Sequence, residues 1–177
     1  MQQPQRNGVL ILSQTPPSLF VEEWYEIASR EHFWMQWRLS AFLRQLRDLG
    51  ISTQVPWRGL DVGCGNGVTC EQLEERSLWR IDGADLNKQS LSIHMKRRGQ
   101  SLFYDIHDRR PELTGVYDFI ILFDVIEHVE DTERFLGSTL HHLKPGGWLF
   151  INVPAISSML GAYDRAAGHL RRYSKRS

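Results

Sequence analysis

The residues that could do chemistry are densest in one short stretch, Leu60-Asp-Val-Gly-Cys-Gly-Asn-Gly67. It places three glycines at alternate positions, Gly63, Gly65 and Gly67. Without a Cβ these residues can adopt positive φ and let the backbone lie against a flat polar ligand, although glycine-rich strand ends also form plain tight turns. A dinucleotide fingerprint would have glycine where Val68 stands, and the carboxylate of Asp61 would repel a pyrophosphate. The stretch therefore favours a nucleoside ligand that carries positive charge.

Further carboxylates follow the next apolar runs of the chain. Asp85 comes about 20 residues after the glycine stretch, where a carboxylate can accept hydrogen bonds from ribose hydroxyls. Asp82 is a weaker candidate because it lies inside the apolar run. Asp105 follows the run after that and could accept a hydrogen bond from the exocyclic amino group of adenine. Each carboxylate could simply cap a strand end, but together they indicate a site for an adenosine-containing ligand.

Groups that could accept a proton gather after the long apolar run 117–123, namely Asp124, Glu127 and His128. Because histidine titrates near neutral pH, His128 could act as a general base toward a hydroxyl group. His169 and Tyr173 are further candidates nearer the end of the sequence. The same residues could instead shape a pocket or cap the next helix. No group of metal-ligand residues stands out by its spacing, so no metal is expected.

Alternating strands and helices would have to position these residues. The expected strands are residues 59–62, 79–86, 101–104, 117–123 and 148–153. The expected helices are residues 21–49, a helix from the glycine turn to about 76, residues 87–98 and residues 131–143, with a turn at 144–147. This alternation predicts a parallel sheet with right-handed crossovers, in which ligands lie at the carboxyl ends of the strands.

The motifs in this order resemble those of class I S-adenosylmethionine-dependent methyltransferases. The resemblance covers roughly residues 30 to 175 and rests on Leu60 to Gly67, Asp85, Asp105, Tyr117 to Val129 and Leu143-Lys-Pro-Gly-Gly147. The segment Glu127-His128-Val129 and the Lys-Pro-Gly-Gly turn are similar to those of ubiquinone-type O-methyltransferases and of methyltransferases found with glycan and lipid biosynthesis. The resemblance implies a Rossmann-like α/β three-layer sandwich. It also implies S-adenosylmethionine as cofactor and S-adenosylhomocysteine as product.

The resemblance also implies roles for individual residues. Arg38, on the entry helix, would meet the carboxylate of the cofactor. The full set expected to bind the cofactor is Arg38, Asp61, Gly63, Cys64, Gly65, Gly67, Asp85, Leu86, Asp105, Ile106 and Phe123. The expected catalytic residues are His128, Glu127 and Asp124. The expected reaction moves a methyl group to a small-molecule or lipid- or glycan-linked acceptor, on an oxygen.

Two parts of the chain stand apart from this pattern. Residues 1–18 are polar and proline-punctuated, which predicts a flexible segment ahead of a methyltransferase domain at 19–177. The family fold continues beyond the strand at 148–153, so the domain is expected to lack its last strands. That strand would then expose an apolar edge, which predicts either that the chain is part of a longer protein or that the edge is covered by its own C-terminal segment, by a homodimer or by another partner. The basic residues Arg171 to Arg176 would begin the next helix.

Composition narrows the functions that the chain could have. The 177 residues carry a formal net charge of zero, which gives no general attraction to nucleic acid or to anionic lipid. No apolar run is long enough for a membrane span, and two cysteines, Cys64 and Cys70, favour a cytoplasmic location. Two alternatives to an active methyltransferase are left open. One is a catalytically silent subunit that binds S-adenosylmethionine, and the other is an NAD-dependent oxidoreductase, against which Asp61 and Val68 argue.

Overall fold

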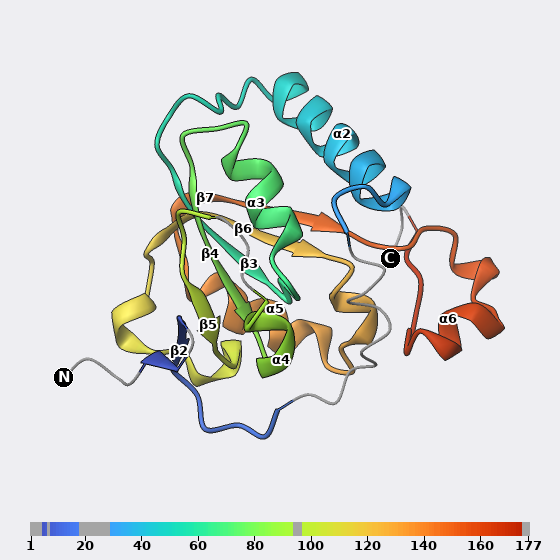
Figure 1. Ribbon diagram of the computed structural model, residues 1–177. Coiled ribbons are helices and arrows are strands. Elements are labelled where there is room, and N and C mark those ends of the chain that lie inside the picture. The colour runs from blue at the N-terminus through green and yellow to red at the C-terminus, as the bar shows by residue number, and fades with distance from the viewer. Residues whose placement is uncertain (1–4, 7, 18–28, 94–96, 175–177) are drawn as a thin grey trace.

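Seven strands form one sheet in the order β1-β2-β5-β4-β3-β6-β7 (Figure 1). The computed structural model describes residues 5–6, 8–17, 29–93 and 97–174. The strands are β1 Gln5–Arg6, β2 Val9–Ile11, β3 Arg58–Val62, β4 Arg80–Asp85, β5 Ser101–Phe103, β6 Tyr117–Phe123 and β7 Leu143–Asn152. All neighbouring strands are parallel except β1 and β2. The mostly parallel sheet expected from the sequence is confirmed.

Helices cover both faces of the sheet, which makes three layers (Figure 1). The α-helices are α2 Phe33–Asp48, α3 Val68–Glu74, α4 Lys88–Leu91, α5 Thr132–Leu140 and α6 Ala162–Ala166. The short 3₁₀ turns are η1 Ile106–Asp108, η2 Pro111–Leu113, η3 Ile126–His128 and η4 Ser157–Met159. Side chains of α2, α3 and α4 join one buried apolar cluster, and Phe135 of α5 joins the cluster on the opposite face. The layering is that of a Rossmann-like fold.

Strand β6 shows why the centre of the sheet is stable. Phe119 and Ile121 point into one cluster, while Ile120 and Leu122 point into the other, and all four are fully buried. Successive side chains of a strand face opposite sides, so a strand covered on both faces must be apolar throughout. The run Phe119 to Phe123 of β6 meets this requirement, whereas Asp118, nearer the start of the strand, is half-buried and pairs with Lys144.

The N-terminal residues differ from expectation. Residues 1–18 were predicted to be a flexible segment, but Val9–Ile11 pairs with Ser101–Phe103 as a parallel strand of the sheet. Val9 is buried in the apolar cluster on the α2 side. The prediction is therefore wrong for this stretch because its short apolar run, Val9 to Leu12, finds a partner strand that no local pattern reveals. Residues 1–4, 7 and 18 lie outside the described residues.

Two helices are shorter than the sequence suggested. Asn87 caps α4 as expected, accepting hydrogen bonds from the amides of Gln89 and Ser90, but the helix ends at Leu91 rather than near residue 98. Residues 94–96 lie outside the described part. The entry helix was expected from residue 21; α2 begins only after His32, whose side chain accepts a hydrogen bond from the Trp34 amide. Residues 18–28 are likewise not described.

The expected Lys-Pro-Gly-Gly turn lies within β7. The pairing with β6 runs from Tyr117↔Leu143 directly to Phe119↔Trp148, so residues 144–147 bulge out of register. Gly146 takes a φ of 76°, which favours glycine. From Trp148 onward the pairing is regular, as predicted for the strand at 148–153.

The C-terminal residues lie against the body of the protein. Arg171 donates to the Thr132 hydroxyl and to the Glu130 carbonyl. The sequence analysis predicted that a helix begins at this residue. That expectation is wrong for the described residues 171–174, which are not helical, because their side chains and backbone bond to neighbouring segments instead.

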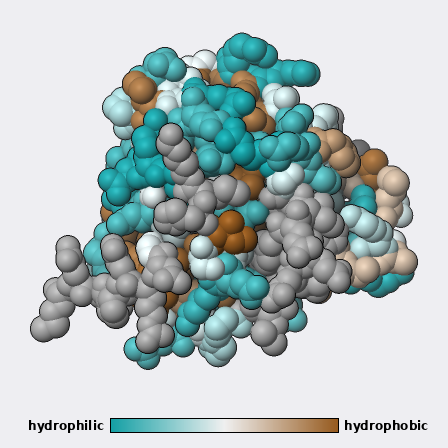
Figure 2. All heavy atoms as spheres, in the orientation of Figure 1, coloured by the Kyte–Doolittle hydropathy of each residue, from teal (hydrophilic) through white to brown (hydrophobic). Residues whose placement is uncertain are grey.

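Within the described residues no helix has the length and apolarity needed to cross a membrane. The face in Figure 2 is mostly hydrophilic where it is coloured, with apolar residues in separate groups.

Candidate active site

The glycine turn connects β3 to α3 and needs glycine at each alternate position. The φ angles of Gly63, Gly65 and Gly67 are 75°, 55° and 85°. The amide of Gly63 donates to the Ala84 carbonyl at 2.8 Å, which holds the turn against the end of β4. A Cβ on Gly63 would lie 2.7 Å from Cγ2 of Val125. Both backbone conformation and space therefore exclude larger residues at the start of the turn.

Asp85 ends β4 and holds the glycine turn through its carboxylate. Oδ2 accepts a hydrogen bond from the Gly65 amide at 2.8 Å, and Oδ1 accepts one from the Asn87 amide at 2.8 Å. Burial raises the pKa of Asp85, and the amide donors partly offset this rise. Each carboxylate oxygen can accept a second hydrogen bond. The group can therefore receive ribose hydroxyls while it keeps the turn in place.

Asp61 lies beneath the turn and is almost fully buried. Its Oδ2 accepts a weak hydrogen bond from the thiol of Cys70 at 3.4 Å. Burial raises the pKa of Asp61 to about 6, opposed by the nearby positive charge of Arg38. The other thiol, Cys64, is buried in the turn itself, and burial raises its pKa well above the ordinary value. Both cysteines are thus neutral packing groups of the turn.

Arg38 of α2 crosses to the end of β6. Its Nη1 lies 2.6 Å from Oδ2 of Asp124, and its Nη2 donates to the Thr69 hydroxyl at 2.6 Å. Trp34 Nε1 donates to the same oxygen of Asp124 at 3.1 Å, and the guanidinium stacks over the Phe123 ring. Asp124 has a φ of 57°, an uncommon conformation for a residue with a side chain. Such strain at a strand end is typical of functional sites.

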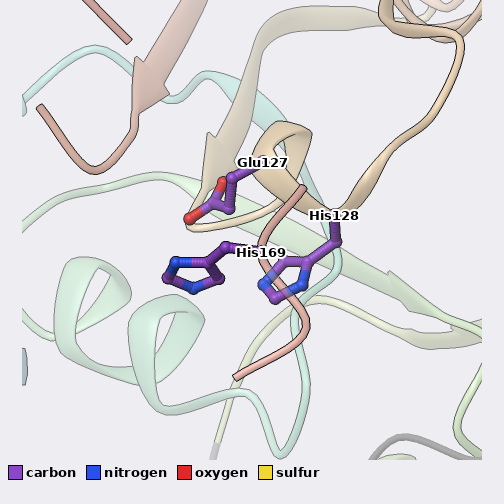
Figure 3. Close-up of side chains that lie close together, drawn as sticks. All are labelled: Glu127, His128 and His169. Atoms are coloured by element: carbon purple, nitrogen blue, oxygen red, sulfur yellow. The ribbon is translucent and has the colours of Figure 1, made fainter. Parts of the chain in front are cut away.

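Three titratable side chains meet beside this ion pair (Figure 3). Glu127 and His128 come from η3, and His169 comes from the segment after α6. One ligand-type atom of each lies within 4.8 Å of the others. Among the described residues these groups could hold a divalent cation, or they could pass a proton. The sequence predicted no metal-ligand group, because His169 is distant in the chain and only the fold brings it here.

The two histidines are oriented by hydrogen bonds. Nδ1 of His128 lies 3.1 Å from the Gly168 carbonyl, and Nδ1 of His169 lies 3.0 Å from Oδ1 of Asp164. A nitrogen facing a carbonyl or carboxylate carries the proton, so Nε2 holds the lone pair in each neutral ring. Burial lowers the pKa of His128, which keeps that ring neutral. Arg172 also donates to Asp164, and this contact lowers the pKa of the Asp164 carboxyl.

Glu127 is the electrostatic anomaly of the site. Its side chain is fully buried, and neither carboxylate oxygen has a hydrogen-bond partner within the described residues. Burial raises the pKa of Glu127 to about 7, so the group changes charge near neutral pH. A buried carboxyl without a partner is costly, and such groups are commonly retained for function.

The expected adenine side lies at the end of β5. Asp105 follows Tyr104, whose amide donates to the Asp85 carbonyl at 3.3 Å, so both carboxylates lie at the carboxyl ends of the neighbouring strands β4 and β5. The Asp105 carboxylate accepts hydrogen bonds from the His107 amide at 2.9 Å and the Thr15 hydroxyl at 3.1 Å. Ile106, expected to touch the cofactor, is buried in the cluster on the α5 side. Leu86 packs half-buried against the other cluster.

The sequence analysis did not identify the residues that orient the predicted site residues. Thr69 supports Arg38, Asp164 supports His169, and Thr15 supports Asp105. None of these has a local signature, since a single threonine or aspartate is common in any part of a chain. The sequence did single out Asp61, Asp85, Asp105 and Asp124, and the structure places them at the carboxyl ends of neighbouring strands.

The chain is similar to known methyltransferases in sequence and to solved structures in fold. The methyltransferase domain family matches residues 25–177. The ubiquinone biosynthesis O-methyltransferase of Chromobacterium violaceum is 33% identical over 99 residues, which are 52% of this chain and 42% of that protein. The phosphoethanolamine N-methyltransferase 2 of Haemonchus contortus, in complex with S-adenosyl-L-methionine, superposes with a TM-score of 0.60 and 22% identity, covering 74% of this chain and 33% of that one.

A second similar structure is the [4+2]-cyclase SpnF, with a TM-score of 0.56 and 23% identity over 75% of this chain and 53% of that chain. An N-methyltransferase and a cyclase thus share the fold, so the fold alone does not decide the reaction or the acceptor. This chain belongs to the methyltransferase domain family, as its motifs suggested. It spans about half the length of the curated relatives, 42% of one and 51% of another.

Proposed function

We propose that this chain is the cofactor-binding and catalytic domain of an S-adenosylmethionine-dependent methyltransferase. The observation that carries the proposal is the glycine turn held by Asp85 in a chain of the methyltransferase domain family. The complex of Haemonchus contortus phosphoethanolamine N-methyltransferase 2 with S-adenosyl-L-methionine supports the same cofactor. The turn would face the methionine part and Asp85 the ribose.

Methyl transfer from a sulfonium is a direct displacement, so the protein has to align the acceptor and take up a proton. We infer a hydroxyl acceptor, because groups able to accept a proton stand at the end of β6. His128 is kept neutral by burial, and His169 is oriented by a buried carboxylate, the arrangement that makes an imidazole an effective base. The O-methyltransferase relatives agree with this acceptor class.

The acceptor itself is proposed to be a small molecule or a lipid- or glycan-linked metabolite. Trp34 and Trp37 stack on each other at the start of α2, and Trp37 is exposed. Such aromatic surface suits an apolar acceptor, and the net charge of zero does not favour nucleic acid. A cytoplasmic location remains a proposal based on the cysteines alone.

Ligand-induced thermal stabilisation tests the cofactor. S-adenosylhomocysteine at a hundredfold excess over its Kd should add about 2.7 kcal/mol to the free energy of unfolding, whereas NAD should add nothing. Stabilisation by NAD alone would instead support the oxidoreductase alternative. A protein that binds S-adenosylhomocysteine but methylates no hydroxyl or amine in an acceptor panel would be the silent subunit.

The proton acceptor is tested by replacing each histidine with asparagine. His128→Asn or His169→Asn should lower kcat for a hydroxyl acceptor by about a hundredfold or more, with unchanged affinity for S-adenosylhomocysteine. His141→Asn is the matched control, since that ring bonds the Thr114 hydroxyl near the surface. Full activity in both site variants would remove the general-base role.

A further inference from the structure

The N-terminal strap, defined as residues 12–15, lies at the carboxyl ends of the strands, where the cofactor is expected. Strand β2 runs parallel to β5, so its carboxyl end points to the same edge as those of β4 and β5 (Figure 1). Parallel strands place their ligand-binding loops at this edge. The strap is outside the residues matched by the methyltransferase domain family, which begin at 25.

Backbone contacts fix the strap to the end of β5. The amides of Leu12 and Ser13 both donate to the Phe103 carbonyl, at 3.0 and 3.2 Å. Arg110 Nη1 donates to the Leu12 carbonyl at 2.8 Å. These bonds lie at the end of the pairing Ile11↔Phe103 and continue the strand into the loop.

Two hydroxyl groups of the strap converge on Asp105. The Ser13 hydroxyl accepts a hydrogen bond from the Asp105 amide at 2.8 Å and donates to Oδ2 of Asp108 at 2.6 Å. The Thr15 hydroxyl donates to Oδ2 of Asp105 at 3.1 Å. Ser13 is buried and Thr15 is half-buried. The backbone and the carboxylate of Asp105 are thus each held by one strap residue.

The carboxylate of Asp105 retains capacity for a ligand. Oδ1 accepts from the His107 amide and Oδ2 accepts from Thr15, whereas a carboxylate offers about four acceptor positions. The two protein donors come from the strap and from η1. They fix the direction of the remaining lone pairs without using them.

We propose that Ser13 and Thr15 are positioning residues for adenine recognition: they hold Asp105 so that its carboxylate accepts a hydrogen bond from the exocyclic amino group of the cofactor. This inference rests on the proposed function and adds a specificity element supplied by the N-terminal strap. A positioned acceptor rejects a base that presents a carbonyl oxygen at that place, because two acceptors would face each other.

Calorimetric titration with S-adenosylhomocysteine and with S-inosylhomocysteine tests the proposal, since the latter carries oxygen in place of the amino group. The wild-type protein should prefer the adenosine ligand by about tenfold to a hundredfold. Thr15→Val, which keeps the shape and removes the hydroxyl, should lower that preference at least threefold, and Asp105→Ala should abolish it. Adding Thr15→Val to Asp105→Ala should change nothing more.

Thr114→Val is the matched control, because that hydroxyl contacts His141 away from Asp105. Equal weakening of both ligands in Thr15→Val would show a merely structural strap and overturn the proposal, as would an unchanged preference. Thermal unfolding confirms that each variant is folded, and Ser13→Ala provides a second test if Thr15→Val is not. If the wild-type protein binds neither nucleoside, the proposed function itself fails, and this inference fails with it.

Discussion

At the scale of single residues, the carboxylates of the site differ in their partners. Asp85 accepts two backbone amides and anchors the glycine turn, whereas Glu127 has no partner among the described groups. Asp124 shares one oxygen with Arg38 and Trp34. The same side-chain chemistry therefore holds the glycine turn at β4 and pairs with cations at β6, whereas at η3 the carboxyl is buried without a partner among the described residues.

Removing the Asp85 carboxylate should weaken cofactor binding. Asp85→Ala is expected to cost about 1.5–3 kcal/mol of affinity for S-adenosylhomocysteine, about tenfold to a hundredfold, because charge-assisted hydrogen bonds to ribose are lost. Calorimetry measures the change. Glu133→Gln, which removes an exposed charge on α5, is the control and should bind like the wild type. Wild-type affinity in Asp85→Ala would remove the ribose assignment.

Glu127 should make stability depend on pH. Its pKa rises from 4.5 to about 7 on folding, so between these values the folded protein holds a proton that the unfolded chain has released. The free energy of unfolding should therefore fall as pH rises through this window, by at most about 1.4 kcal/mol for each unit of pH, and level off above it.

Urea unfolding of the wild type and of Glu127→Gln between pH 4.5 and 8 measures this dependence. The variant cannot titrate at this position. The wild type should therefore lose stability relative to the variant as pH rises, and the variant should be favoured at high pH. Asp61 contributes a slope of the same sign in both proteins and cancels in the difference. Parallel curves would show that Glu127 does not titrate in this range.

At the scale of elements, the turn between β3 and α3 combines backbone conformation with close packing. Gly63→Ala should destabilise the protein by about 1–2 kcal/mol for the left-handed φ and further for the contact with Val125. Gly50→Ala is the matched control: its φ of 69° is similar, but nothing lies within 4 Å of an added Cβ. The excess cost of Gly63→Ala in urea unfolding measures the packing alone. Only Gly63→Ala should weaken S-adenosylhomocysteine binding.

At the scale of the whole molecule, the two edges of the sheet differ. The edge beyond β5 carries β2 and the short β1, whereas β7 ends the other side of the sheet as the structure describes it. Trp148 and Ile151 of β7 are 39% and 42% exposed. An apolar edge strand offers unpaired backbone groups to another chain.

Residues 1–177 alone should therefore self-associate through β7 as concentration rises. Ile151→Lys should reduce this association, because a charge on an edge strand opposes pairing. Sedimentation velocity over a range of concentrations measures it. Leu78→Lys, at a site that is exposed but not in any strand, should leave association unchanged. A monomeric wild type at every concentration would contradict the prediction.

The sequence by itself determined the central sheet and the order of the site residues. Strand β6 was predicted at its observed bounds, because a long and mostly apolar run is typical of a strand that is buried on both faces. The glycine turn and the carboxylates after successive strands were also visible, since parallel strands bring consecutive chain segments to one edge. These features depend on neighbours in the chain or on a regular alternation of elements.

Tertiary structure alone decided the contacts between distant segments. It placed β2 beside β5 and Thr15 against Asp105, 90 residues away. It also brought His169 to Glu127 and His128. A four-residue apolar run or a single histidine carries too little local information to predict its partner. Which distant segments pair depends on the surfaces that remain uncovered once the core strands are packed. Those surfaces exist only in the folded chain.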